Sequence, residues 1–307
     1  MRVASLFCGC GGLDLGFKQA GFTLVWSNDL DKYAVQTYNS NFDHQAVCAD
    51  INHINIDDIP EHDVLIGGFP CQPFSMMGKE KGFNDQRGTL FFKVAEIIKN
   101  QRDRGHQPQI VVLENVRNLM THNKGKTFAV IKDKLEELGY TVYSSKMNSA
   151  DYGVPQTRNR VFLVCFLGKT AFDFPPKIEL DKKLQDILEY EVDDKYFLSD
   201  RILKTILSNG TGGYYAKSEI DLKIARPLTA TMAKMHRACQ DNYVTQERGI
   251  RRLTPRECAR LQGFPEDFII PVSDAQAYKQ FGNAVTVNVS YAIAKSIMEQ
   301  VVQNDNE

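Results

Sequence analysis

The 307-residue sequence contains no long apolar run, although 43% of its residues are hydrophobic. A helix that crosses a bilayer needs roughly 20 consecutive apolar residues, and no stretch of this chain approaches that length. The opening residues, MRVASLFCGCGG, are a short apolar segment that runs into glycines, and they do not resemble a secretion signal. We therefore expect a cytosolic protein with no membrane partner, built as one large domain or as one domain plus a smaller module.

The sequence also lacks an excess of charge of either sign, because it has 37 basic and 38 acidic residues and a net charge of -1. Any nucleic-acid surface must therefore come from local clusters. Such clusters occur at Lys79, Lys81 and Arg87, at Arg158 and Arg160, and at Arg248, Arg251, Arg252, Arg256 and Arg260. A solvated face explains such a cluster as readily as a binding site does.

Regularly spaced cysteines are absent as well. The seven cysteines are an odd number without a repeated pair spacing, so neither a disulfide framework nor a metal site is predicted. Most of them are expected to be small buried residues in a reducing compartment.

Short apolar runs alternate with helical patterns through the first half of the chain. The expected strands are VASLF, TLVWSND, DVLIGGF, QIVVLENV, TVYSSKMN and RVFLVCFL, and the expected helices include LDLGFKQAGF, KYAVQTYNSNF, LFFKVAEIIKN and TFAVIKDKLEELGY. This alternation predicts an α/β fold, a doubly wound and mostly parallel sheet that binds ligands at the carboxyl ends of its strands.

The alternation stops between about residues 180 and 250, where LSNGTGGYYAKSE is typical of a loop or irregular β structure. Two strand pieces, IARPLTATM and NYVT, are expected to follow. A helix is predicted at TPRECARLQ, with a Thr cap and a Pro in its first turn, and another at VNVSYAIAKSIMEQVV. We expect a main domain from residues 1–180 and 280–307, and a smaller module from residues 181–279, because the apolar last helix must return to the sheet.

A glycine-rich turn follows the first expected strand. Its residues Gly9, Gly11 and Gly12 permit a tight turn and let a ligand approach the amino end of the next helix. Asp29 ends the second strand, where acidic residues commonly hold a ribose, and Asp50 follows a third apolar run. Taken alone, the turn fits a dinucleotide, an adenosylmethionine or mere packing, and Asp29 fits a helix cap.

Cys71 stands between two prolines at the end of the strand DVLIGG, followed by a long polar loop. A cysteine fixed in this way suits a nucleophile. A buried structural cysteine is the ordinary alternative, but it explains neither the prolines nor the loop.

Charged residues also end or precede two later strands. Glu114 closes the apolar run IVVLE, and its pKa is expected to rise enough for it to donate a proton. Arg158 and Arg160 precede VFLVCF, where two guanidiniums can grip a carbonyl or a phosphate. A helix cap or a structural ion pair would account for the same residues.

Seven segments resemble, in order, the successive motifs of the bacterial-type DNA cytosine C5-methyltransferases. They are FCGCGG, SNDLDKYA, GGFPCQPFSMMGKEKGFNDQRGTLFF, LENVRNL, DYGVPQTRNRVF, RRLTPRECARLQGFP and QFGNAVTVNV. The resemblance covers nearly the whole chain outside the region between about residues 180 and 250. It implies the Rossmann-like fold of class I adenosylmethionine-dependent methyltransferases, with a second, smaller target recognition domain.

The resemblance implies that Cys71 attacks C6 of a flipped-out cytosine, so that C5 accepts the methyl group of S-adenosyl-L-methionine. Glu114 would donate a hydrogen to N3, Arg160 would act at O2, and Arg158 would support the site. The cofactor product would be S-adenosyl-L-homocysteine.

The cofactor contacts implied by the resemblance are Phe7, Gly9, Gly11, Gly12, Asp29, Asp50, Phe69 and Asn283. The family commonly has Glu followed by Trp at the second strand, whereas this chain has Asp29 and Leu30, which predicts less apolar cover over the cofactor. Ala284 stands where Ser is common.

The implied DNA contacts are Ser75, Lys79, Lys81 and Arg87 in a mobile loop, and Thr229, Thr231, His236, Arg237, Gln240 and Arg256 in the recognition region. The cluster from Arg251 to Arg260 is expected to support contacts with the DNA backbone. The resemblance does not decide between Thr229 and Thr231, and His236 and Arg237 are also explained as simple surface residues.

The implied partner is double-stranded DNA with a specific target sequence, and the implied role is restriction-modification or the protection of phage or host DNA. A cognate restriction endonuclease would act separately, and the enzyme is expected to be a monomer. Three alternatives stay open here: an RNA-methylating relative that uses the same cysteine, an inactive DNA-binding member, and a nicotinamide dehydrogenase. The retained Cys71, Glu114 and Arg160 argue against the second, and the seven ordered segments argue against the third.

Overall fold

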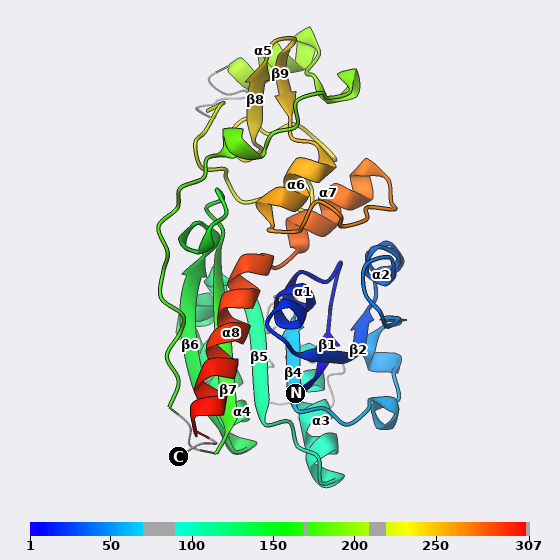
Figure 1. Ribbon diagram of the computed structural model, residues 1–307, viewed down its shortest axis with the longest axis vertical. Coiled ribbons are helices and arrows are strands. Elements are labelled where there is room, and N and C mark those ends of the chain that lie inside the picture. The colour runs from blue at the N-terminus through cyan, green and yellow to red at the C-terminus, as the bar shows by residue number, and fades with distance from the viewer. Residues whose placement is uncertain (70–89, 169–170, 209–218, 305–307) are drawn as a thin grey trace.

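The computed structural model describes residues 1–69, 90–168, 171–208 and 219–304. The molecule is elongated, with a sheet domain at one end and a smaller, irregular region at the other (Figure 1). The smaller region and its junction with the sheet contain α5 (Asp200–Leu207), β8 (Tyr243–Gln246), β9 (Gly249–Arg252), α6 (Pro255–Leu261) and α7 (Asp274–Asn283).

A seven-stranded sheet in the order β3-β2-β1-β4-β5-β7-β6 forms the larger part of the molecule. Its strands are β1 (Arg2–Leu6), β2 (Thr23–Asp29), β3 (Val47–Cys48), β4 (Val64–Gly68), β5 (Ile110–Val116), β6 (Tyr140–Asn148) and β7 (Asn159–Leu167). The first five strands in the order pair in parallel, and β7 runs antiparallel to both β5 and β6. The predicted doubly wound, mostly parallel α/β fold is confirmed.

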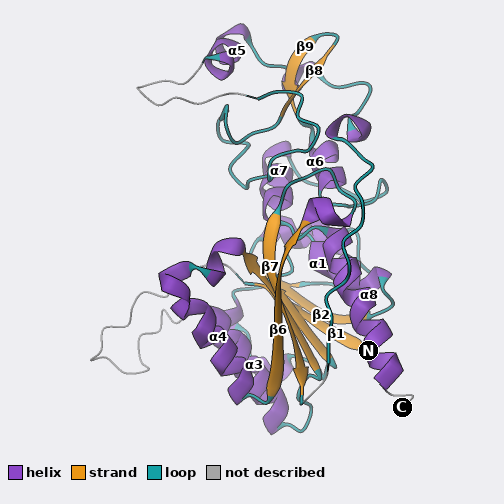
Figure 2. Cartoon of the chain, turned by 90° about the vertical axis from the view of Figure 1, so that its left-hand side faces the viewer, coloured by secondary structure: helices purple, strands orange, loops and turns teal. Residues whose placement is uncertain are grey.

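Helices cover both faces of this sheet (Figure 2). On one face lie α3 (Leu90–Asp103) and α4 (Lys126–Glu137), whose apolar residues pack on the strands in one core cluster. On the other lie α1 (Gly12–Gln19) and α8 (Val287–Asn304), which share a second cluster. The last helix therefore returns to the sheet, as its apolar pattern predicted. The helix α2 (Lys32–Asn39) packs beside β2 and β3, at that edge of the sheet, through Val35 and Tyr38.

The smaller region follows the sequence predictions only in part. NYVT contributes to β8, but the prediction of a strand at IARPLTATM was wrong. Residues 224–232 form no strand, and Ala225 makes only an isolated bridge with Gln156. Pro227, which has no N–H to donate to a ladder, explains part of this difference. The predicted Thr254 caps the helix α6. Its hydroxyl accepts from the Glu257 N–H, while the Glu257 carboxylate accepts from the Thr254 N–H.

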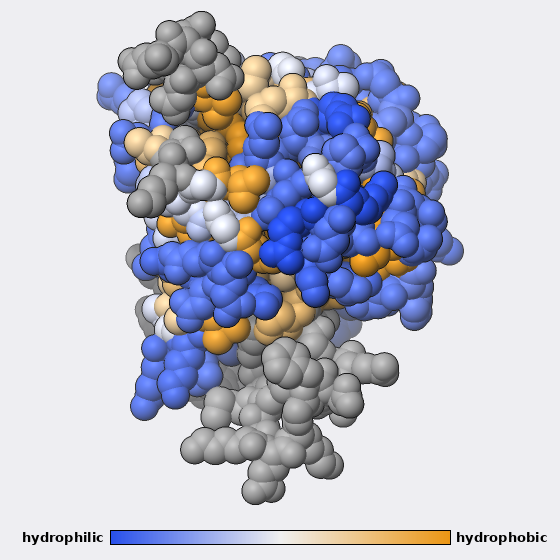
Figure 3. Space-filling model, turned by 90° about the horizontal axis from the view of Figure 1, so that it is seen from below, coloured by the Kyte–Doolittle hydropathy of each residue, from blue (hydrophilic) through white to orange (hydrophobic). Residues whose placement is uncertain are grey.

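The face of the molecule that lies farthest from the smaller region is mostly hydrophilic over its described atoms, with small, separate apolar spots (Figure 3). Among the described residues, no helix combines the length and the apolar character that a membrane crossing requires.

Candidate active site

A pocket of about 440 Å³ lies at the carboxyl ends of the parallel strands. Residues that end β1, β2, β4 and β5 line it, together with residues from α7 and the start of β7. The strand order reverses between β1 and β4, and this switch point is where open α/β sheets bind their ligands. The volume suits a small organic cofactor.

Seven of the eight predicted cofactor residues line this pocket, namely Phe7, Gly9, Gly12, Asp29, Asp50, Phe69 and Asn283. Gly11 does not belong to the lining. It has a φ of 92° at the start of α1, and a Cβ there would clash with the ring of Phe42. Packing of the turn against this ring, rather than contact with the pocket, therefore requires glycine at position 11.

The carboxylate of Asp29 holds the glycine-rich turn. It accepts hydrogen bonds from the N–H groups of Gly9 and Asp31, both at 2.8 Å, and burial raises its pKa. Phe7 has a φ of 56°, a strained backbone conformation of a kind that clusters at ligand sites. Leu30, which stands where the family commonly has Trp, lies on the pocket rim with 68% of its surface exposed.

Glu114 and Arg160 meet on the pocket wall. The Glu114 Oε1 and the Arg160 Nε lie 2.9 Å apart, because the antiparallel pairing of β5 with β7 brings the end of one strand to the start of the other. Burial raises the pKa of Glu114, and the charges of Arg160 and Arg158 oppose this rise. The two residues thus form an ion pair, and both also line the pocket.

Arg158 is fully buried and is not part of the pocket lining. Its guanidinium donates to the carbonyls of Leu228 at 3.1 Å, Gly282 at 3.1 Å and Ala284 at 2.8 Å. Burial lowers its pKa to about 9. These bonds tie the end of α7 to the smaller region, so the supporting role predicted for Arg158 would be one of positioning.

Cys71, Ser75, Lys79, Lys81 and Arg87 all lie in the segment 70–89, outside the described residues. Phe69 and Leu90, the described residues on either side of this segment, both line the pocket. Only Pro70 stands between Phe69 and Cys71 in the sequence. The Asn115 amide donates to the Phe69 carbonyl at 2.8 Å and fixes the chain at this point.

Three of the residues predicted to contact DNA form one hydrogen-bonded group. Arg237 donates to the hydroxyl of Thr231 and to the side-chain carbonyl of Gln240, both at 2.9 Å. The His236 ring stacks on Tyr243. Thr229 has different surroundings, because its buried hydroxyl has no partner among the described residues and its backbone packs on Gly282.

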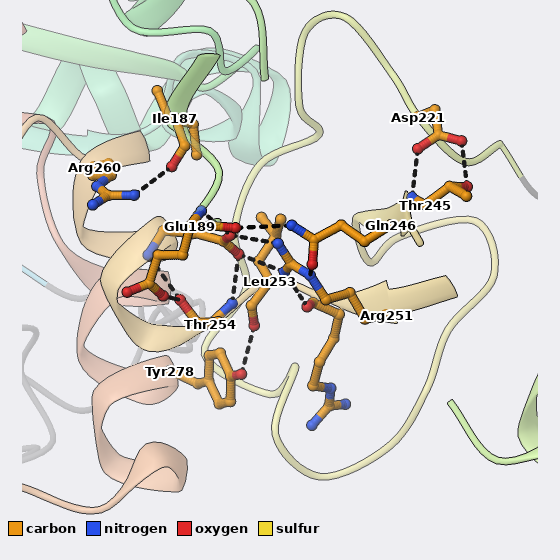
Figure 4. A network of polar contacts seen from close by, with 12 residues as sticks. Ile187, Glu189, Asp221, Thr245, Gln246, Arg251, Leu253, Thr254, Arg260 and Tyr278 are labelled. Atoms are coloured by element: carbon orange, nitrogen blue, oxygen red, sulfur yellow. Dashed lines mark hydrogen bonds and ion pairs between the residues drawn. The ribbon is translucent and has the colours of Figure 1, made fainter. Parts of the chain in front are cut away.

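Within the basic segment from Arg248 to Arg260, Arg251 is buried, so it belongs neither to a solvated face nor to a surface that DNA could reach. The Arg251 side chain is 0% exposed, and it donates to both Glu257 oxygens at 2.8 and 2.6 Å and to Gln246 at 2.8 Å (Figure 4). Arg260 binds Glu266 at 2.6 Å. Arg256 donates to the carbonyl of Phe268 at 2.8 Å, so its predicted contact with DNA would have to compete with this bond.

Asp14 is a pocket residue that the sequence analysis missed. Its buried carboxylate accepts hydrogen bonds from Ser5 at 2.8 Å, Ser27 at 3.1 Å and Tyr38 at 2.8 Å. An acidic residue in the first turn of a helix is commonplace, so the sequence carries no signal that would single it out.

The described cysteines and possible metal ligands add no further centre. Cys8, Cys10, Cys165 and Cys258 are buried, whereas Cys48 and Cys239 are exposed. Within the described parts of the chain, no group of His, Cys, Asp and Glu side chains could hold a metal ion.

The model of the C-5 cytosine-specific DNA methylase family matches residues 1–299. The chain belongs to this family. It is 43% identical to the type II methyltransferase M1.ScrFI of Lactococcus lactis subsp. cremoris, over 97% of this chain and 78% of that protein. It is 35% identical to the type II methyltransferase M.HhaI of Haemophilus parahaemolyticus, over 97% of this chain and 94% of that protein.

Solved structures resemble this methylase in fold. The S. pombe Dnmt2 methyltransferase matches with a TM-score of 0.79 at 21% identity, over 97% of this chain and 99% of that one. A putative DNA modification methyltransferase encoded within an E. coli prophage matches with a TM-score of 0.68 at 21% identity, over 98% of this chain and 99% of that one. The predicted family is confirmed, and the chain is a cytosine-specific DNA methyltransferase.

Proposed function

We propose that this enzyme transfers the methyl group of S-adenosyl-L-methionine to C5 of a cytosine flipped out of a specific short duplex sequence, through a covalent bond between Cys71 and C6. The observation that carries the proposal is the Glu114–Arg160 pair, 2.9 Å apart, on the wall of the pocket that also gathers the predicted cofactor residues. Family membership supports the reaction type.

The charge of the pocket fits this cofactor. Glu114 and Asp31 are paired with Arg160 and Lys279. The remaining acidic residues of the lining, Asp14, Asp29 and Asp50, form no ion pair with any described residue. S-adenosylmethionine carries a positive sulfonium and supplies an electrophilic methyl group. Phe7 and Leu30 offer apolar cover for its adenine, and Asp29 and Asp50 offer acceptors for its hydroxyl and amino groups. The product would be S-adenosylhomocysteine.

The chemistry at the base would proceed by addition and elimination. The Cys71 thiolate adds to C6, which makes C5 nucleophilic enough to take the methyl group. The C5 proton then leaves to a base, and the thiolate leaves C6, which restores the aromatic ring. Burial raises the pKa of Glu114, and its protonated form would donate to N3, while Arg160 would stabilise charge at O2.

DNA would lie between the catalytic domain (residues 1–180 and 280–307) and the target recognition domain (residues 181–279). Flipping the base costs a few kcal/mol, which contacts from Ser75, Lys79, Lys81 and Arg87 would offset. Thr229 or Thr231, with His236, Arg237, Gln240 and Arg256, would contact bases or phosphates.

The relatives named as type II methyltransferases support a role in restriction-modification, with an endonuclease that acts separately, or in the protection of phage or host DNA. We propose a monomer, because flipping one base requires no symmetry.

Label transfer from tritiated S-adenosylmethionine tests the proposal. The purified protein is mixed with mixed-sequence duplex DNA or with tRNA, and the modified base is identified by hydrolysis and chromatography. We expect 5-methylcytosine in DNA, its loss in Cys71→Ser, and its retention in the matched control Cys48→Ser, whose cysteine is exposed. Label confined to tRNA, or equal labelling of DNA by both variants, would contradict the proposal.

A further inference from the structure

Asp14 is a carboxylate that the proposed chemistry does not use. We propose that Asp14 makes the cofactor pocket discriminate between S-adenosylmethionine and its product S-adenosylhomocysteine, by holding a buried negative charge that favours the positive sulfonium. This inference rests on the proposed function, and it assigns Asp14 a role in cofactor specificity and product release.

The hydrogen bonds around Asp14 fix the position of its carboxylate without neutralising its negative charge. The carboxylate belongs to α1, and it accepts from Ser5 of β1, Ser27 of β2 and Tyr38 of α2. All three donors are neutral hydroxyl groups, and no described cation forms an ion pair with Asp14. Hydroxyl donors order a carboxylate and leave its net charge intact, so the field of Asp14 remains uncompensated.

This field acts on the pocket because both Asp14 and its partner Ser5 line it. Asp14 is 0% exposed, so little water screens the charge on that side. The two ligands differ by one methyl group and one positive charge. Contacts with the adenine, the ribose and the amino acid therefore cancel in the ratio of their dissociation constants, whereas interaction with a fixed negative charge does not.

The titratable groups around Asp14 leave two carboxylates, the buried Asp14 itself and the partly buried Asp29, on this side of the pocket. Burial raises the pKa values of Cys8 and Cys10, so both thiols stay neutral, and it raises that of Tyr38 far above neutrality. His44, which contacts Ser27 at 3.0 Å and Tyr38 at 3.3 Å, has a lowered pKa. Asp29, at the end of β2, is the other nearby carboxylate, and two backbone N–H groups bind it.

A structural role alone explains Asp14 less well. An asparagine could accept from Ser27 and Tyr38 through its Oδ1 and donate through its Nδ2 to Ser5, whose hydroxyl is free to rotate, without placing a charge in the core. Burial raises the pKa of Asp14 to about 6, so the carboxylate is ionised at pH 7.5 in spite of its surroundings. A buried charge without an opposite charge beside it is costly, which is typical of a residue kept for function.

Calorimetric titration of the full-length protein with each ligand at pH 7.5 tests the inference. Asp14→Asn is expected to raise the dissociation constant of S-adenosylmethionine by about tenfold, as expected for the loss of one buried charge near another, with a much smaller change for S-adenosylhomocysteine. Asp43→Asn, which removes an exposed carboxylate, is the matched control and should leave the ratio unchanged. An equal loss for both ligands, or a greater loss for the product, overturns the inference. Failure of the unmodified protein to bind either ligand would instead overturn the proposed function.

Ser27→Ala keeps the test decisive if Asp14→Asn does not fold. Removing this donor should raise the pKa of Asp14, because a hydroxyl that stabilises the ionised form is lost. The preference for S-adenosylmethionine, measured from pH 5 to pH 8, should therefore disappear at a higher pH than in the unmodified protein. If the pH at which half of this preference is lost is the same in both proteins, the inference is overturned.

Discussion

Glu114 is the residue at which local environment and proposed chemistry can be compared most directly. It ends a strand of buried apolar residues, lies 2.9 Å from Arg160, and has a pKa that burial raises. A raised pKa keeps more of the carboxyl protonated near neutral pH. The protonated form is the one that can donate to N3 of cytosine.

Glu114→Gln tests this role through its pH dependence. As pH rises through the pKa of Glu114, the donor is lost, so single-turnover methylation by the unmodified protein should acquire a declining component. The glutamine amide donates at every pH but is a weaker acid, so this component should vanish while the rate falls by about 100-fold. Glu137→Gln, at an exposed position, serves as the control. A Glu114→Gln variant with the unmodified rate and pH profile would contradict the assignment.

The pH dependence of stability that Asp14 contributes is opposite in sign to that of most carboxylates. Its pKa in the folded protein is about 6, above the usual 3.8, so folding binds a proton and stability declines as pH rises from about 4 to about 6. A difference of about two pH units corresponds to roughly 3 kcal/mol. Asp14→Asn should therefore raise the melting temperature at pH 7.5 and have little such effect near pH 4. A lower melting temperature of Asp14→Asn at pH 7.5 would show that the hydrogen bonds of the carboxylate stabilise the fold by more than its buried charge destabilises it.

The element that organises the smaller region is the Arg251–Glu257 pair. Glu257 of α6 accepts from Arg251 of β9 and from the backbone N–H of Glu189, while Gln246 of β8 donates to the Glu189 carbonyl (Figure 4). The pair therefore joins the hairpin, α6 and the chain that arrives from the sheet domain. The Thr254 hydroxyl donates to Glu189 and completes the connection.

Arg251→Ala should leave Glu257 buried without its cation. Breaking a buried pair in this way costs about 3–5 kcal/mol, whereas Arg248→Ala, at an exposed ion pair with Asp194, should change stability by no more than about 0.5 kcal/mol. Denaturant unfolding of both variants measures the difference. Equal effects of the two substitutions would mean that the buried pair does not hold these elements together.

The sequence predicted some elements of this region and not others, for physical reasons. α6 has a local signal, a Thr cap with Glu257 three residues later, and it begins where expected. Arg251 looked like part of a basic surface because sequence spacing does not reveal that its guanidinium turns inward to Glu257. The strand expected at IARPLTATM failed because an apolar pattern cannot show whether a partner strand is available.

At the scale of the whole molecule, the strand and helix pattern predicted the sheet, and the ordered motifs predicted that distant segments meet at one edge. Phe7, Asp29, Glu114, Arg160 and Asn283 do line one pocket. Asp14 was missed, and the contacts of Arg158 could not be predicted, because both depend on long-range packing. Arg158, for example, binds carbonyls that lie 70 or more positions along the chain.

Trapping the adduct is the sharpest test of covalent attack by Cys71 on cytosine in DNA. In duplex DNA that contains 5-fluorocytosine, the C5 substituent cannot leave as a proton after methyl transfer, so the bond between Cys71 and C6 should persist. We expect a complex that survives denaturing electrophoresis, requires S-adenosylmethionine, and carries the DNA on the peptide containing Cys71. The complex should be absent with Cys71→Ser. If the unmodified protein forms no complex, or if Cys71→Ser forms it equally well, Cys71 does not attack the cytosine.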